Sequence, residues 1–179
     1  MYQDSNEKRL GDLMRRIFPN TNSDYLVERF GLLVTKENIS GKAALSVTTD
    51  TASGRNVYCI SLSNSNTFKD NRWEIACAVG HLLLGHRHVF DPAKASSPQA
   101  ATERHGAVIF ARAFLLPTDK LLMRVVESLR LDSLSETFRL PELVIKDALL
   151  DLGFMNFPDY EEAMEGISVT PNQSVQYIH

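Results

Sequence analysis

Apolar residues recur at helical spacing close to the start of the chain. Four of them lie three or four positions apart, namely Leu10, Leu13, Met14 and Ile17. This spacing predicts a helix over residues 8–16. A second short helix is expected after Asn22 or Ser23, because both side chains are suited to cap a helix N-terminus. The chain is therefore predicted to open with two helices.

Two segments with strand-like patterns follow. Residues 41–47 and 56–62 have strand-like patterns of apolar side chains. In the second segment the apolar residues Val57, Cys59 or Ile60, and Leu62 alternate with other residues. Between the two segments, residues 48–55 are rich in turn-forming types and carry Gly54 near the end. The two segments are therefore predicted to form an antiparallel hairpin.

A nearly continuous apolar segment predicts a central helix. After a polar run over residues 61–71, Asp70 or Asn71 is expected to cap a helix that continues to Leu84. This helix is apolar nearly all round, and such helices are buried by the rest of the fold.

The remaining half of the chain predicts mainly helices. Ser97 followed by Pro98 is typical of a helix start, after a surface loop over residues 87–100. Further helices are expected over three segments, namely 118–129, 131–138 and 141–152, and Gly153 is expected to stop the last one. The fold class is thus α+β, mainly helical around a small antiparallel or mixed sheet. Residues 1–155 are expected to form one domain, and the polar residues 156–179 a loosely packed tail.

Composition narrows the class of protein. A chain of 179 residues with 44% apolar content suits a globular domain, and its net charge of −3 provides no broad basic field, which makes nucleic acid an unexpected partner. No apolar run approaches the roughly 18 to 20 residues that span a bilayer, and residues 1–10 are polar. We therefore expect a cytoplasmic protein without membrane contact, in which Cys59 and Cys77 are free thiols.

Residues 72–86 carry the candidate chemistry. They read Arg-Trp-Glu-Ile-Ala-Cys-Ala-Val-Gly-His-Leu-Leu-Leu-Gly-His. This segment resembles the active-site helix of the ImmA/IrrE family of metallopeptidases, in which two histidines at i and i+4 bind zinc and the glutamate between them is the general base. In this chain the first histidine position is Cys77, the glutamate position is Ala78, and the second histidine is kept as His81.

The resemblance extends beyond that helix. Residues 107–117, Ala-Val-Ile-Phe-Ala-Arg-Ala-Phe-Leu-Leu-Pro, are similar to a later segment of the family, and residues 134–154 are similar to its closing pair of helices. The order of strands and helices before residue 72 also matches, so the resemblance covers residues 10–154. It implies a zincin-like fold with a central helix of the active-site type.

The resemblance places a third metal ligand, a glutamate in the family, at Arg104, with Glu103 and His105 on either side. One residue turns a helical side chain by about 100°, so neither neighbour is directed at the same point. The metal-ligand candidates are thus Cys77, His81, Glu103 and His105. A Cys-His-carboxylate zinc site competes with a simpler interpretation, in which Cys77 is a small buried hydrophobe and no cofactor is bound. His86 and His88 at the helix end need no metal, since the helix dipole accounts for them.

Ala78 decides the expected function. A methyl group accepts no proton, and general-base catalysis is worth about 10² to 10⁴ in rate. Members of the family are found beside helix-turn-helix repressors of phages and mobile elements, and many inactivate those repressors. By resemblance we expect a catalytically impaired pseudoenzyme that acts as an antirepressor by binding a regulatory protein, such as a helix-turn-helix repressor.

Two alternatives remain at this stage. One is an active zinc metallo-endopeptidase with a divergent Cys/His/Glu site. The other is a DNA-binding regulator, because residues 134–152 have helix-turn-helix character, although their second helix is acidic. For a bound peptide we expect an edge strand to be the acceptor, and the candidate residues are Asn56, Tyr58 and Ile60.

Overall fold

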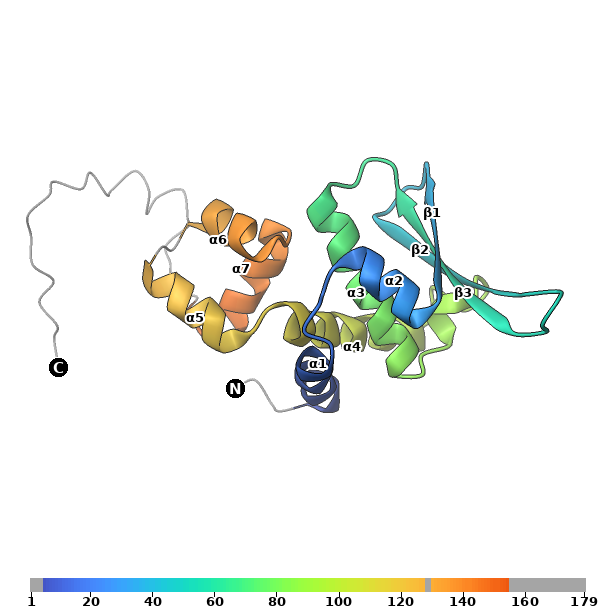
Figure 1. The fold of residues 1–179 in the computed structure, drawn as a ribbon, viewed down its shortest axis with the longest axis horizontal. Helices are drawn as coiled ribbons and strands as arrows, with labels where there is room; N and C mark the ends of the chain where they lie inside the picture. Colours follow the sequence, from blue (N-terminus) through green and yellow to red (C-terminus); the bar gives the residue numbers. More distant parts are fainter. Residues whose placement is uncertain (1–4, 128–129, 155–179) are drawn as a thin grey trace, which may run out of the picture.

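The computed structural model describes residues 5–127 and 130–154. Seven α-helices, one 3₁₀ helix and a three-stranded mixed sheet make up this part of the chain, which confirms the α+β, mainly helical class (Figure 1). In chain order the elements are α1 (Asn6–Ile17), α2 (Ser23–Phe30), β1 (Leu32–Glu37), β2 (Ala43–Thr49), β3 (Asn56–Ser63), α3 (Phe68–Leu83), η1 (His88–Phe90), α4 (Pro98–Leu115), α5 (Thr118–Glu127), α6 (Leu131–Phe138) and α7 (Glu142–Asp151).

The sheet has the strand order β1-β3-β2. Strands β2 and β3 pair antiparallel, with Thr49 opposite Asn56, which confirms the predicted hairpin. Strand β1, which the sequence pattern did not predict, pairs parallel with β3. From Tyr58 onward β3 is paired on both sides, so this part of its backbone is not free to accept a peptide. The expectation that Asn56, Tyr58 and Ile60 belong to an edge strand is therefore wrong, and the edges are β1 and β2.

Helix α3 begins earlier than the sequence pattern predicts. Its N-cap is Thr67, whose hydroxyl accepts a hydrogen bond from the Asp70 amide, while the Asp70 carboxylate accepts one from the Thr67 amide at 2.9 Å. This reciprocal capping box makes Asp70 the third residue of the helix rather than its cap. Helix α3 then runs through a fully buried stretch from Ile75 to His81, as expected for a central helix.

Helix α4 packs between α1 and α3. Its predicted start is confirmed, because Ser97 caps the helix and Pro98 is its first residue. Close packing depends on two glycines: a Cβ on Gly80 of α3 would lie 2.7 Å from Cδ1 of Phe110, and one on Gly11 of α1 would lie 2.5 Å from the Phe110 carbonyl oxygen. Both helices thus approach α4 more closely than any side chain would permit.

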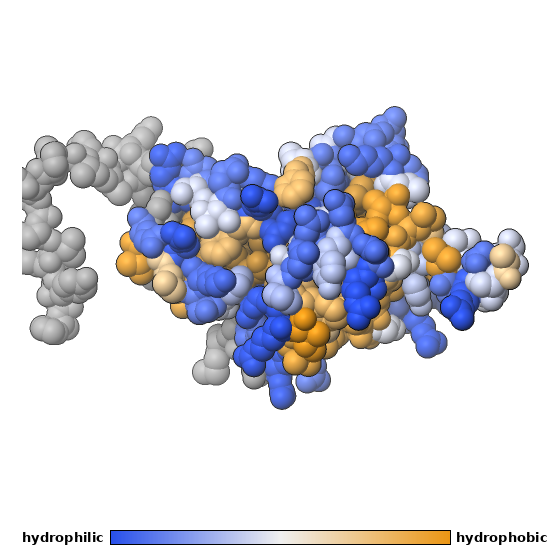
Figure 2. All heavy atoms as spheres, viewed as in Figure 1, coloured by the Kyte–Doolittle hydropathy of each residue, from blue (hydrophilic) through white to orange (hydrophobic). Residues whose placement is uncertain are grey.

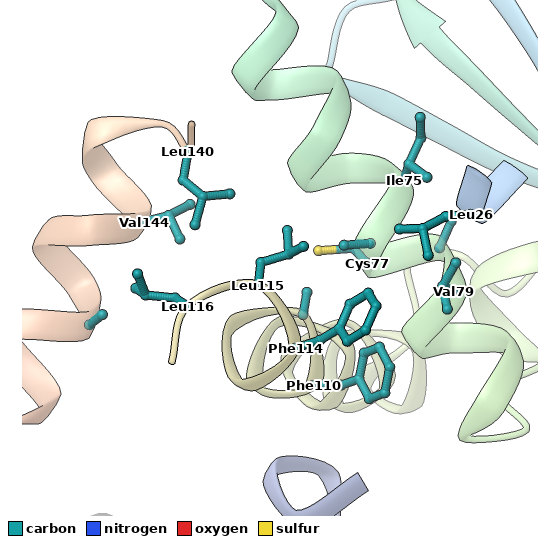
Figure 3. Packing of buried hydrophobic residues seen from close by; sticks show 14 of the residues in the cluster. Leu26, Ile75, Cys77, Val79, Phe110, Phe114, Leu115, Leu116, Leu140 and Val144 are labelled. Carbon is teal, nitrogen blue, oxygen red and sulfur yellow. The ribbon is translucent and has the colours of Figure 1, made fainter. Parts of the chain in front are cut away.

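Helices α6 and α7 close the core beyond the C-terminal end of α4, where Leu140 and Val144 face Leu116 (Figure 3). Leu134, Leu140 and Ile145 are at most 2% exposed and belong to the same apolar cluster as Phe110. An ion pair joins Arg112 of α4 to Asp151 of α7. The helix-turn-helix character of this segment is therefore accounted for by packing.

Two sequence-based expectations concern residues that the structure does not describe. The proposed tail over residues 156–179 lies outside the described residues, and so does the proposed domain boundary at residue 155. Over residues 5–127 and 130–154, none of the helices combines the length and the apolar character that crossing a membrane requires.

Candidate functional site

Cys77, Ala78 and His81 lie within α3, as predicted. Their exposed fractions are 9%, 1% and 3%, so the positions that resemble a peptidase motif are closed to solvent. Figure 3 shows the Cys77 sulfur pointing toward Leu115, at the end of α4, among apolar side chains.

The environment of Cys77 favours the neutral thiol. Burial raises the pKa of Cys77 well above its usual value, and the nearby charge of Glu74 raises it further. Metal ligation and nucleophilic attack both require the thiolate. In the described part of the chain, no hydrogen bond joins this thiol to His81 or to any other base. Cys77 therefore matches the small buried hydrophobe better than the ligand or the nucleophile.

His81 is paired with a second histidine. The Nδ1 atoms of His81 and His86 lie 2.9 Å apart, so one of them donates and the other accepts. Gly85, in the left-handed conformation, reverses the chain, and the His86 amide donates to the His81 carbonyl oxygen at 3.0 Å. Burial, followed by the charge of His86, lowers the pKa of His81 to about 3. Both imidazoles are thus held neutral in a structural hydrogen bond.

Glu103 is used to hold the loop that follows α3. Its carboxylate accepts from the amides of Arg87 and Val89 at 3.1 and 3.0 Å and lies 2.8 Å from Nδ1 of His88. Partial burial alone would raise the pKa of Glu103, but these hydrogen bonds outweigh it and leave the pKa at about 2. The carboxylate therefore fastens η1 and is directed at His88 rather than at His81.

Gly106 of α4 faces the ring of His86. A Cβ on Gly106 would lie 3.4 Å from Cε1 of His86, whereas the Arg104 guanidinium donates two hydrogen bonds to the Ala95 carbonyl oxygen. Arg104, which the resemblance aligns with the third ligand, is thus engaged with the loop before α4. His105 is exposed and lies near Glu7.

The residues present do not fit a zinc ion. Cys77 is held as a thiol, His81 is bonded to His86, and Glu103 is bonded to η1. Within residues 5–127 and 130–154, no group of three or more His, Cys, Asp and Glu side chains is arranged to hold a metal. A zinc site needs three or four such ligands around one point. The structure thus brings Cys77 and His81 onto one helix, but does not bring Glu103 or His105 to them.

Sequence reasoning missed the roles of His86 and Gly106. The signal for His86 was present, because the Gly85-His86 pair follows the helix at the spacing of a glycine C-cap that folds back on the last turn. For Gly106 no local signal exists, since its role depends on how α4 is rotated against α3.

Comparison with known proteins places this architecture in a family. Residues 27–150 match the model of the IrrE N-terminal-like domain of peptidase family M78. A solved Mycobacterium tuberculosis transcriptional regulator is similar with a TM-score of 0.50 and 14% identity, over 76% of this chain and 45% of that one. This chain spans less than half of the regulator, and the likeness concerns the fold alone. No curated protein shows a significant match. Because the matched segment spans α3, α4 and most of the remaining fold, the chain belongs to the family of IrrE N-terminal-like domains.

Proposed function

We propose that this chain is a catalytically impaired member of its family that regulates a repressor, of the kind found on phages and mobile elements, by binding it. In this proposal the IrrE-like scaffold is kept for recognition while its hydrolytic chemistry is lost. The partner class is a helix-turn-helix regulatory protein, and the complex forms without cleavage.

The observation that carries the proposal is the buried methyl group of Ala78. It stands where the family has its general base, and its exposed fraction is 1%. No neighbouring acid replaces it: burial raises the pKa of Glu74 to about 7, but Glu74 lies one turn earlier on α3. Loss of a general base lowers the rate by about 10² to 10⁴. The displacement of Glu103 and the closed surroundings of Cys77 lower it further.

The test uses a candidate helix-turn-helix repressor from the locus of this protein. The repressor is incubated with the full chain at substoichiometric and equimolar ratios, and both cleavage and complex formation are followed. We expect a stoichiometric complex and an intact repressor at every ratio, with or without a chelator.

Turnover of many repressor molecules per chain, abolished by the chelator, would contradict this proposal and favour the divergent zinc endopeptidase. A salt-sensitive shift of operator DNA by this chain alone would favour the DNA-binding alternative instead. Absence of any complex and of any cleavage would reject the repressor as the target.

A further inference from the structure

A groove separates α1 and the start of α3 from α5 and α6. Its volume is about 790 Å³, and its floor is apolar, with Phe114, Leu115 and Phe138 among the lining residues. Neither Cys77 nor His81 lines it. The groove is thus a surface distinct from the positions that resemble the peptidase motif.

The rim of the groove is basic although the whole chain carries a net charge of −3. The cations that line it are Arg15, Arg16, Arg72, Lys120 and Arg124, against the acids Asp119 and Glu127. Asp12 pairs with Arg15, and Glu127 pairs with Arg124. Among the described residues, no carboxylate lies within ion-pair distance of the other three cations: Arg16, Arg72 and Lys120. The groove therefore presents a local positive potential.

Arg72 is the most constrained of these cations. Its guanidinium donates to the carbonyl oxygens of Phe138 and Arg139 and, at 3.0 Å, to the hydroxyl of Thr21. Burial lowers the pKa of Arg72, and the charge of Arg139 lowers it further. A partly buried cation that meets only neutral acceptors and a like charge is stabilised when a carboxylate approaches.

Helix α5 places exposed apolar side chains next to the basic rim of the groove. Met123, which lines the groove, is 67% exposed, and Val126, one turn later, is 88% exposed. Figure 2 shows apolar surface among hydrophilic surface at the α5 end of the molecule. Methionine adapts its shape to different ligands and is frequent at binding surfaces for peptides.

We propose that this groove binds an acidic protein segment, which places carboxylates on Arg16, Arg72 and Lys120 and apolar side chains on Phe138 and Met123. Charge complementarity argues for an acidic ligand, and the apolar floor argues for a peptide rather than a nucleic acid. The inference rests on the proposed function, because it names the surface through which the regulatory partner is bound.

The probe is a fluorescein-labelled synthetic peptide in which glutamates alternate with leucine and phenylalanine. Its counterpart carries lysine at every glutamate position. Binding to the full chain is followed by fluorescence anisotropy at low and high salt. We expect the acidic peptide to bind and the basic one not to bind, with affinity falling as salt rises.

The variants are Arg16→Glu/Lys120→Glu, in which two exposed cations of the groove are reversed, and Arg55→Glu, an exposed cation in the β2–β3 turn, as the matched control. The groove variant is expected to weaken binding by roughly tenfold or more, and Arg16→Gln/Lys120→Gln by less, while the control keeps the wild-type affinity. Circular dichroism verifies that each variant is folded.

Equal binding of both peptides, equal loss in the control, or no loss in the groove variant would overturn the inference. Tighter binding after Asp159, Glu161, Glu162 and Glu165 are replaced by their amides would show that the chain's own acidic residues occupy the groove, and would overturn its assignment to a partner. If the repressor binds the groove variant and the wild type with equal affinity, the assignment of the binding surface is wrong while the proposed function stands. If the repressor binds neither protein, the proposed function itself fails.

Discussion

Burial of Glu74 and His81 affects folding with opposite dependence on pH. The pKa of Glu74 is raised from 4.5 to about 7, so the folded state binds more protons than the unfolded state between these values. Its stability contribution is therefore lost as pH rises. The pKa of His81 is lowered from 6.5 to about 3, so its contribution is lost as pH falls below 6.5. In the wild type the two trends oppose each other near pH 6.

Replacing Glu74 by glutamine separates these trends. At about pH 8 the variant is expected to be more stable by on the order of 2 kcal/mol, because no charge is buried, and this gain should vanish near pH 5. The variant should then lose about 2 kcal/mol between pH 7.5 and pH 5 through His81. Urea unfolding across this range measures both effects. A Glu74→Gln protein with the same pH profile as the wild type would show that Glu74 is not desolvated.

The rotation of α4 determines which substitutions would restore a zinc site of the family's type. Cys77→His/Ala78→Glu should bind no stoichiometric zinc, because Gly106 offers no third ligand. Adding Gly106→Glu is expected to raise the zinc content, since this position faces His86, whose Nδ1 lies 2.9 Å from Nδ1 of His81. Elemental analysis of folded protein is the measurement, and Arg104→Glu in the same background is the matched control. Zinc recovery with Arg104→Glu instead would show that α4 is rotated differently.

At the scale of elements, the contact between α1 and α4 depends on Gly11. A Cβ there would lie 2.5 Å from the Phe110 carbonyl oxygen and 2.8 Å from the Ala113 Cβ. Relief requires α1 to move, so Gly11→Ala should destabilise the fold by about 2 kcal/mol, despite the better helix propensity of alanine.

Gly106→Ala is the matched control for that substitution. Its new Cβ meets neighbours only at 3.4 Å or more, and it should gain up to about 1 kcal/mol from helix propensity. Thermal unfolding of both variants gives the comparison. Helix α1 lies outside the family-matched residues 27–150, so a neutral Gly11→Ala would indicate that α1 is an accessory to the fold.

At the scale of the whole molecule, one apolar cluster joins α3, α4, α6 and α7. Because Ile145 of α7 is fully buried in it, Ile145→Ala should cost about 2 to 5 kcal/mol. This loss of stability should be shared by every helix that contributes to the cluster. Hydrogen exchange of the α3 amides, which lie in a different helix, measures it. Faster exchange confined to α6 and α7 would show instead that these two helices unfold as a separate unit.

The sequence by itself determined the elements that depend on local patterns. The Ser97-Pro98 start of α4, the apolar central helix and the β2–β3 hairpin follow from residues a few positions apart. The tertiary structure decided what depends on distant contacts. Parallel pairing with β1 makes β3 central, and the rotation of α4 directs Gly106 at His86. The reversal at Gly85 brings His86 onto His81. These outcomes arise from packing between elements far apart in the chain, where one residue of helical rotation redirects a side chain by about 100°.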